Sequence, residues 1–232
     1  MPKPLIYAHR GSSADHPENT RAAFMAAIDE GAHGFETDLR LTKDGEVVLW
    51  HDSNMQNLAA NKAAIAQSRY SEIKAIYPDV LKLEELLEIA VKANIALALE
   101  TKHPVPTGNE IEHRTIEIIK PFINSIKISL LSFSWLAIEK ATRDSGKLET
   151  VALINPMNQT IMKRFSSANS VAPALELIKA DPEQVTRYQR AGKRVFIWTV
   201  NEISDLELCA ELGVDVVITD MPSRAVSVLG YP

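Results

Sequence analysis

Two carboxylates, Glu36 and Asp38, alternate along a stretch whose residue pattern is that of a β-strand. Side chains two residues apart on a strand point to the same face, so these two project together. Like charges this close repel each other unless a proton or a cation lies between them, and paired oxygen ligands suit Mg²⁺ or Ca²⁺. A solvated strand face is the alternative, because Asp and Glu are usually exposed. Taken alone, the pair is weak evidence for a metal site.

The residues that follow strengthen this interpretation. Asp44-Gly45 is a hairpin-type turn signal, and residues 46–50 have the pattern of a second strand that ends at His51 and Asp52. The hairpin therefore returns a histidine to the neighbourhood of the carboxylates. Histidine exchanges protons near neutral pH, so this arrangement predicts a reactive site.

Strand and helix patterns alternate along the whole chain of 232 residues. Apolar runs predict strands at residues 5–8, around Glu36, and at 95–99, 125–133, 150–154, 170–177, 194–200 and 214–219. Apolar residues at helical spacing predict helices at 23–28, 83–91, 111–122, 135–144, 160–165, 182–191 and 203–212. Nearly continuous apolar strands indicate a parallel sheet buried on both faces.

About eight strand–helix units favour an α/β fold of the (β/α)₈ TIM-barrel type over an open doubly wound sheet. We expect a single domain over residues 1–232. Residues 53–80 are polar and poorly patterned, and we expect them to form a small insertion after the hairpin of the second strand. Within it, the Ala-rich stretch 59–66 has the composition of a helix.

Composition narrows the classes of function. The 25 basic and 30 acidic residues give a net charge of −5, which argues against non-specific binding of nucleic acid. No apolar run is long enough to predict an integral membrane segment. The N-terminal residues lead into a strand without a secretory apolar region, so we expect a cytoplasmic protein. Cys209, the single cysteine, lies on a predicted helix and is expected to be a buried structural thiol. The sequence does not indicate the oligomeric state.

Polar residues recur where the predicted barrel strands end. In such barrels the carboxyl ends of the strands form the face that carries the chemistry, so these residues are expected to converge there. They are His9-Arg10-Gly11, Glu36 and Asp38, Glu100 and Lys102, Ser132-Phe133, Trp198-Thr199-Val200-Asn201 and Thr219-Asp220.

These segments together resemble the glycerophosphodiester phosphodiesterase family. The resemblance covers nearly the full length, and its motifs occur in the order expected for the family. They are His9-Arg10-Gly11, Pro17-Glu18-Asn19-Thr20, Glu36-x-Asp38, Thr42-x-Asp44-Gly45, His51-Asp52, Glu100-x-Lys102, Trp198-Thr199-Val200-Asn201 and Thr219-Asp220-x-Pro222. Each motif is weak by itself, but eight in order are specific. The resemblance implies a (β/α)₈ barrel with an insertion that corresponds to residues 53–80.

The resemblance also implies roles for individual residues. Glu36, Asp38 and Glu100 match the family's ligands for a divalent metal, Mg²⁺ or Ca²⁺, with Mn²⁺ as a third candidate. His9 and His51 match its general acid/base pair. The remaining matched or neighbouring positions are Arg10 and Lys102 as phosphate contacts, Phe133 and Trp198 as walls of the substrate pocket, and Glu18 and Asn19 as supporting residues. Asn19 or Thr20 is the expected N-cap of the first helix, so capping is a sufficient structural explanation for Asn19.

The implied reaction is metal-dependent hydrolysis of glycerophosphodiesters, such as glycerophosphocholine or glycerophosphoethanolamine, to sn-glycerol 3-phosphate and an alcohol. A lysophospholipase D-like phosphodiesterase would use the same site with an exposed apolar rim around the pocket. A non-catalytic phosphate-binding barrel, or a sugar-phosphate isomerase or aldolase that uses Lys102, are further alternatives. Residues 52–58 lack the Leu-x-Arg-Thr-Thr run frequent in the family, so the leaving-group preference stays open.

Overall fold

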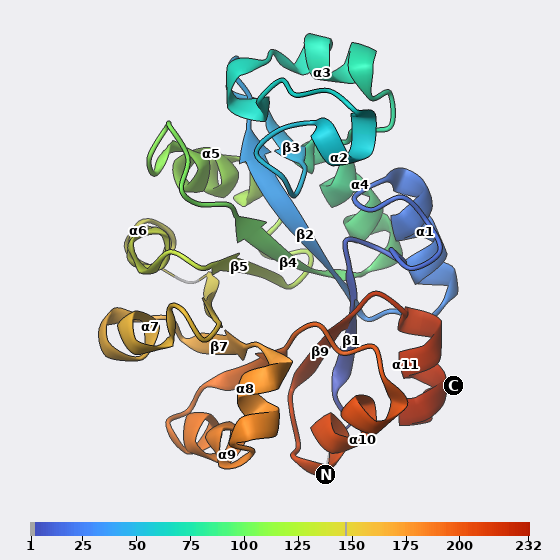
Figure 1. Ribbon diagram of the computed structural model, residues 1–232, viewed down its shortest axis with the longest axis vertical. Helices are drawn as coiled ribbons and strands as arrows, with labels where there is room; N and C mark the ends of the chain where they lie inside the picture. Colours follow the sequence, from blue (N-terminus) through green and yellow to red (C-terminus); the bar gives the residue numbers. More distant parts are fainter. Residues whose placement is uncertain (1–2, 147) are drawn as a thin grey trace.

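Parallel strands close into a barrel in the computed structural model, which describes residues 3–146 and 148–232 (Figure 1). Residues 1, 2 and 147 belong to the predicted single domain but lie outside the described residues. Around the barrel the order is β1, β2, β4, β5, β6, β7, β8 and β9, and the pairing of β9 with β1 completes the circle. The predicted (β/α)₈ fold is confirmed.

The barrel strands are β1 (Leu5–His9), β2 (Gly34–Leu41), β4 (Ala96–Thr101), β5 (Ile128–Ser132), β6 (Glu149–Ile154), β7 (Ser170–Pro173), β8 (Arg194–Ile197) and β9 (Val216–Thr219). Helices on the outside of the barrel are α1 (Arg21–Asp29), α4 (Leu83–Ala93), α5 (Glu110–Ile119), α6 (Trp135–Ser145), α7 (Gln159–Phe165), α8 (Leu175–Ala180), α9 (Glu183–Arg190), α10 (Ile203–Glu211) and α11 (Pro222–Leu229). Strand β3 (Val47–Leu49) pairs antiparallel with β2 and lies outside the closed barrel, as the hairpin signal predicts.

Side chains along each barrel strand point alternately outward to the helices and inward to the barrel, and so form two packing layers. On β4, Leu97 and Leu99 pack outward in the cluster that includes Leu83 and Leu87 of α4. Ala98 belongs to a second cluster inside the barrel. Because Glu100 shares the inward face with Ala98, the strand period carries a carboxylate to the open end of the barrel. The fully buried Cys209 packs among apolar side chains, as predicted, and burial raises the pKa of its thiol to about 12.

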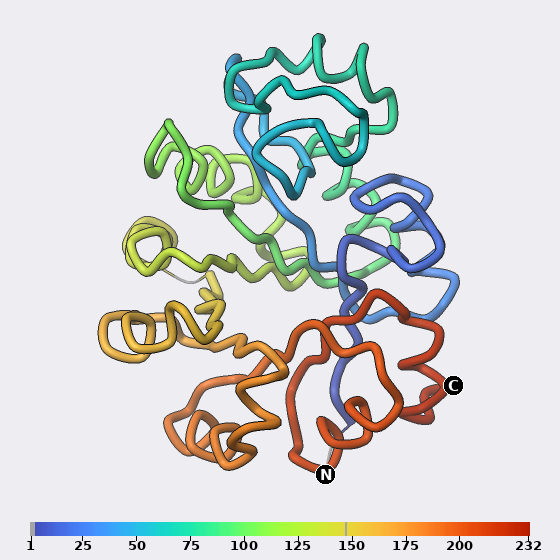
Figure 2. Tube along the Cα trace, in the orientation of Figure 1, coloured from blue at the N-terminus to red at the C-terminus, as the bar shows by residue number. Residues whose placement is uncertain are grey.

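The insertion between β3 and α4 forms a lobe at one edge of the barrel (Figure 2). It contains α2 (Gln56–Ala59), the 3₁₀ turn η1 (Ile65–Gln67) and α3 (Tyr70–Ile76), and its small core includes Trp50, Met55 and Ile73. The expected helix at 59–66 is wrong. Ala60 adopts a left-handed backbone with φ of 50°, which ends α2 after a single turn.

Two other predictions differ from the structure at element ends. The predicted strand 170–177 is the short β7 followed at once by α8, and the strand predicted at 194–200 ends at Ile197. In both cases apolar residues continue past the strand into the mouth of the barrel or a helix, so hydrophobicity alone did not mark the boundary. Among the described helices, none combines the length and apolarity needed to cross a membrane.

Candidate active site

Parallel strand register assembles the site at the carboxyl end of the barrel. His9 of β1 is in register with Glu36 of β2, and Asp38 of β2 is in register with Glu100 of β4. Three strands thus bring one histidine and three carboxylates to the same place. Immediately after β1, Gly11 has φ of 84°, and a Cβ there would come within 2.6 Å of Ala23. Only glycine fits this close turn.

The carboxylates of Glu36, Asp38 and Glu100 form a buried triad whose ligand atoms lie within 4.8 Å of one another. Among the described residues, Glu36 Oε2 has no hydrogen-bond partner although it is buried. An unpaired buried carboxylate oxygen is costly unless a cation or a proton satisfies it. Three hard oxygen donors in this arrangement fit a divalent ion such as Mg²⁺ or Ca²⁺, so the triad could hold a metal ion.

Proton affinities within the triad diverge. Burial and then the charge of Asp38 raise the pKa of Glu36 to about 8, and burial raises the pKa of Glu100 to about 7. Burial alone would also raise the pKa of Asp38, but the charges of Lys102 and Arg10 outweigh it and hold that pKa below its usual range. Asp38 is therefore the triad member that loses its proton most readily, whereas each of the two glutamates binds either a proton or a cation near neutral pH.

Two cations line the same pocket. Lys102 Nζ lies 2.8 Å from both Asp38 Oδ1 and Glu100 Oε1, and Arg10 Nε lies 2.9 Å from Asp38 Oδ2. When all three carboxylates are ionised, the two cations leave one negative charge uncompensated. A bound divalent cation would reverse the sign of the site, which is what an anionic phosphodiester requires.

The first histidine is held from behind by a carboxylate. His9 Nδ1 lies 2.6 Å from Asp220 Oδ1 at the end of β9, while Nε2 faces Glu36 Oε2 at 3.8 Å. Burial by itself would lower the pKa of His9, but the hydrogen bond to Asp220 and the charge of Glu36 outweigh it, so the net pKa is raised. The same contact, against the effect of burial, lowers the pKa of Asp220 to about 2.

The second histidine is held by the insertion. His51 Nδ1 lies 2.9 Å from Asp52 Oδ1, and Asn57 of α2 donates to Asp52 Oδ2 at 2.6 Å. Arg40 donates twice to the His51 carbonyl, at 3.0 and 2.7 Å, and so fixes the backbone at the end of the hairpin. Burial lowers the pKa of His51, in contrast to that of His9.

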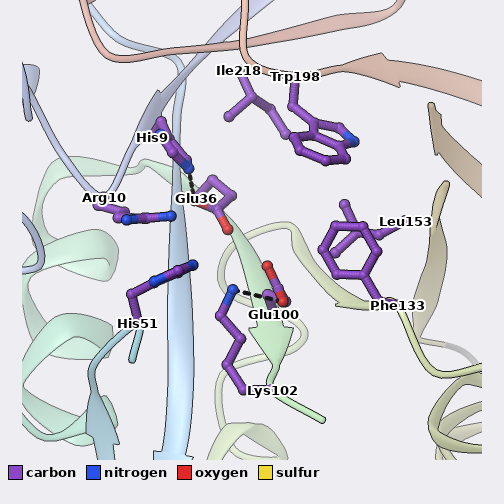
Figure 3. A pocket seen from close by; sticks show the side chains of 10 residues that line it. All are labelled: His9, Arg10, Glu36, His51, Glu100, Lys102, Phe133, Leu153, Trp198 and Ile218. Carbon is purple, nitrogen blue, oxygen red and sulfur yellow. Dashed lines mark ion pairs between the residues drawn. The ribbon is translucent and has the colours of Figure 1, made fainter. Parts of the chain in front are cut away.

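The two histidines, the two cations and the two glutamates of the triad face one pocket, which has a polar and an apolar side (Figure 3). In this view Arg10 lies between the two histidines, and Lys102 and Glu100 lie below Glu36. The opposite wall consists of Phe133, Leu153, Trp198 and Ile218. Phe133 and Trp198 pack edge to face at 5.3 Å, and Trp198 Nε1 donates to the Ala172 carbonyl at 2.7 Å, which fixes the wall.

Glu18 and Asn19 support the polar side rather than a helix. Arg10 Nη1 donates to Glu18 at 2.8 Å, and Asn19 Nδ2 donates to Asp38 Oδ2 at 3.2 Å. The capping interpretation of Asn19 is wrong, because Thr20 is the N-cap of α1 and its hydroxyl accepts from the Ala23 backbone N–H. All the other predicted site residues lie at the triad or in the pocket that it faces.

Comparison with known proteins identifies the family. The sequence profile of the glycerophosphoryl diester phosphodiesterase family matches residues 9–224, nearly the whole chain. The chain belongs to this family. It is similar to the probable glycerophosphodiester phosphodiesterase 1 of Mycobacterium tuberculosis, with 29% identity over 95% of this chain and 90% of that protein.

Solved structures of the family have the same fold. The glycerophosphodiester phosphodiesterase of Thermotoga maritima has a TM-score of 0.84 and 25% identity, covering 98% of this chain and 99% of its own. A phosphodiesterase of Oleispira antarctica, solved with its product sn-glycerol 3-phosphate, has a TM-score of 0.88 and 23% identity over 98% and 97% of the two chains. Family membership confirms the predicted enzyme class, a phosphoric diester hydrolase, and replaces the alternatives of a non-catalytic barrel and an isomerase or aldolase.

The sequence places Asp220 at this end of the barrel but predicts no role for it. Asp220 lies within the quoted Thr219-Asp220-x-Pro222 motif, yet the motif alone gives it no role. Its position directly after a barrel strand was the available signal. The hydrogen bond to His9 depends on which way two side chains turn, and spacing along the chain does not encode that.

Proposed function

We propose that this family member hydrolyses glycerophosphodiesters, such as glycerophosphocholine and glycerophosphoethanolamine, to sn-glycerol 3-phosphate and an alcohol, with a divalent cation. The observation that carries the proposal is the buried carboxylate triad beside two histidines and two cations in one pocket. The product bound to the Oleispira protein supports the same substrate class. The barrel, with residues 53–80 as its insertion, acts as one domain in this proposal.

Arg10 and Lys102 bind the phosphate in this proposal. Arg10 offers a planar fork that matches two phosphate oxygens, and Lys102 offers a point charge. Both side chains are tied to Asp38, so they are oriented before substrate arrives, and little conformational entropy is lost on binding. Glu36, Asp38 and Glu100 would hold the cation, which when bound neutralises charge on the non-bridging oxygens and polarises the phosphorus.

His9 and His51 transfer the protons. The pKa of His51 is lowered, which favours the neutral ring, and in this proposal His51 removes the proton from the attacking hydroxyl, whether of water or of the substrate glycerol. The pKa of His9 is raised, so this residue holds its proton to higher pH than a free imidazole, and in this proposal it donates that proton from Nε2 to the departing alkoxide. Two like groups whose environments separate their pKa values are typical of an acid and base pair.

The apolar wall accounts for the rest of the substrate. Phe133 and Trp198 face the charged side across the pocket, where the carbon backbone of the glycerol can pack while its phosphate meets Arg10 and Lys102. When the glycerol carbons pack against Phe133 and Trp198, water is excluded from the reacting phosphate. The charge interactions between the phosphate and the site are then stronger.

One observation favours a second substrate class, lysophospholipids. An open groove leaves the pocket at Phe133 and runs past Val105 to Leu136, which is 54% exposed. Met157, in the loop after β6, is 90% exposed. The next residue, Asn158, donates to the Phe133 carbonyl at 3.2 Å, so this loop lies beside the groove. This apolar rim would accept a single acyl chain. With lysophosphatidylcholines, KM should then fall as the chain lengthens, and Leu136→Ser should remove that trend without changing turnover of glycerophosphocholine.

The experiment that tests the main proposal is a substrate panel. Metal-stripped protein is assayed with glycerophosphocholine, glycerophosphoethanolamine and lysophosphatidylcholine, each with Mg²⁺, Ca²⁺ or Mn²⁺, and sn-glycerol 3-phosphate or lysophosphatidate is quantified. We expect cation-dependent release of sn-glycerol 3-phosphate. Absence of turnover on every diester with every cation would refute the proposal.

A further inference from the structure

A chain of hydrogen bonds continues behind His9 for two further residues. His9 Nδ1 contacts Asp220 Oδ1 at 2.6 Å, and the other carboxylate oxygen, Oδ2, accepts from Asn201 Nδ2 at 2.7 Å. Asn201 follows β8 and Asp220 follows β9, so adjacent barrel strands hold this chain in place. Ser13 lies within 3.0 Å of Asp220 Oδ1 and within 2.7 Å of the His9 carbonyl, and its hydroxyl can donate to either.

The orientation of the Asn201 amide is determined by its other contacts. The Asp220 backbone N–H donates to Asn201 Oδ1 at 2.9 Å, and the Thr219 hydroxyl donates to the same oxygen at 3.0 Å. The Thr219 oxygen in turn accepts from the Met221 backbone N–H at 3.1 Å. The backbone N–H donors therefore fix which atom donates and which accepts in each of these hydrogen bonds. As a result, Asn201 can present only its NH₂ group to Asp220.

We propose that Asp220 and Asn201 are positioning residues that fix the ring of His9 with hydrogen on Nδ1 and Nε2 turned to the reacting phosphate. This inference rests on the proposed role of His9 as general acid. An ionised carboxylate has no hydrogen to give, so Nδ1 must carry one. As the P–O bond breaks, the Nε2 proton passes to the leaving oxygen, and His9 is left neutral with its Nδ1–H still bound to Asp220.

The substitution Asp220→Asn directly tests the direction of the hydrogen bond between residue 220 and His9. The new amide meets two donors, Asn201 Nδ2 and His9 Nδ1–H, and its NH₂ group must face one of them. Because the Asn201 donor is fixed by the backbone, the NH₂ group turns to His9 and shifts the neutral ring to the Nε2–H form. At a pH high enough to leave His9 neutral, and with saturating Mg²⁺, ¹⁵N NMR of the ring is expected to show Nδ1–H in the unaltered protein and Nε2–H in this variant.

The double substitution Asp220→Asn with Asn201→Asp again presents a hydrogen-bond acceptor to His9 Nδ1. The carboxylate introduced at position 201 would accept from the NH₂ group of the amide introduced at position 220, and it would still accept from the Thr219 hydroxyl. The oxygen of that amide is then free to accept from His9 Nδ1–H, so we expect the Nδ1–H form to return in the double variant. Turnover of glycerophosphocholine should fall about 10²-fold in Asp220→Asn with KM nearly unchanged, and should recover about tenfold in the double variant.

A p-nitrophenyl ester of glycerol 3-phosphate provides the second readout, because its leaving group needs no proton. Asp220→Asn should slow this substrate less than about fivefold. Asp29→Asn, at the exposed end of α1, is the matched control and should change neither substrate nor ring form. Nδ1–H persisting in Asp220→Asn, or no recovery in the double variant, would overturn the inference. The NMR result stands whether or not the diester is the true substrate, so it is separable from failure of the proposed function.

Discussion

The two ends of the barrel both hold carboxylates beside cations, but they are completed in different ways. At the amino end of the strands, Glu149 accepts from Ser129 at 2.6 Å and from Ser170 at 2.7 Å, and both its oxygens lie 2.9 Å from Arg194 Nη1. At the carboxyl end, Glu36 Oε2 is buried without a hydrogen-bond partner among the described residues.

This difference separates a structural cluster from a site that needs a ligand. The Glu149 cluster satisfies its own charge from within the chain, so it contributes to stability and requires nothing else. When all three carboxylates of the triad are ionised, they carry more negative charge than the two cations compensate, and the pKa of Glu36, raised to about 8, reflects the cost of ionising this buried group. The fold thus keeps one end destabilised, which is expected where binding and catalysis take place.

The largest effect should follow loss of a triad ligand. Glu36→Gln keeps the size of the side chain but removes its charge, and we expect kcat/KM for glycerophosphocholine to fall about 10³- to 10⁴-fold because a bound cation supplies several kcal/mol. The melting temperature of the metal-free variant should not fall, because burial already makes ionisation of Glu36 unfavourable and the amide has the same size and no charge. Glu149→Gln is the matched control, and its kcat/KM should stay close to that of the unaltered enzyme. Equal losses of kcat/KM in the two variants would show that the carboxylates at the two ends of the barrel do not differ in function.

The histidines should give the next largest effect. His9→Ala and His51→Ala are each expected to reduce kcat about 10²- to 10³-fold, because each removes one proton transfer. In the unaltered enzyme, activity should fall at low pH as His51 becomes protonated and at high pH as His9 loses its proton. Because the pKa of His51 is lowered and that of His9 is raised, the acidic loss of activity should lie below pH 6.5 and the alkaline loss above it. Full turnover in His9→Ala would exclude its acid role.

Cation affinity should depend on pH in a defined direction. The pKa values of about 8 for Glu36 and about 7 for Glu100 mean that these groups bind protons in the metal-free protein near neutrality. A cation must displace those protons, so affinity rises with pH between about 6 and 8, by up to about tenfold per unit for each proton displaced. Calorimetry in buffers of different ionisation enthalpy would count the protons released. A pH-independent affinity with no proton release would contradict these raised pKa values.

The smallest effect concerns stability at the amino end. Glu149→Ala leaves the buried hydroxyls of Ser129 and Ser170 without their acceptor and Arg194 without its partner. Because Arg194 is partly exposed, we expect a loss of about 2 kcal/mol in the free energy of unfolding. Chemical denaturation measures this loss, and kcat/KM should be unaffected. A stable variant with impaired catalysis would indicate that the two ends are coupled.

The sequence predicted the barrel because its strands are apolar on both faces and alternate with helices at regular intervals. It also predicted which residues gather at the carboxyl end, since strand period and strand order suffice to place Glu36, Asp38 and Glu100 together. It did not predict the short α2, because a single left-handed residue, Ala60, ends that helix. Nor did it reveal the role of Asp220 or the bond from Asn19, predicted as a supporting residue, to Asp38, because these partners depend on side-chain rotation after the backbone has folded.

The measurement that tests this account most directly compares cation binding with catalysis in one preparation. Metal-stripped protein is titrated with Mg²⁺, Ca²⁺ or Mn²⁺ by calorimetry, and turnover of glycerophosphocholine is followed at the same cation concentrations. We expect one tight cation site per chain, absent in Glu36→Gln, and we expect activity to rise from a negligible baseline in parallel with the saturation of this site. Full activity of the metal-stripped enzyme in excess chelator would contradict this expectation.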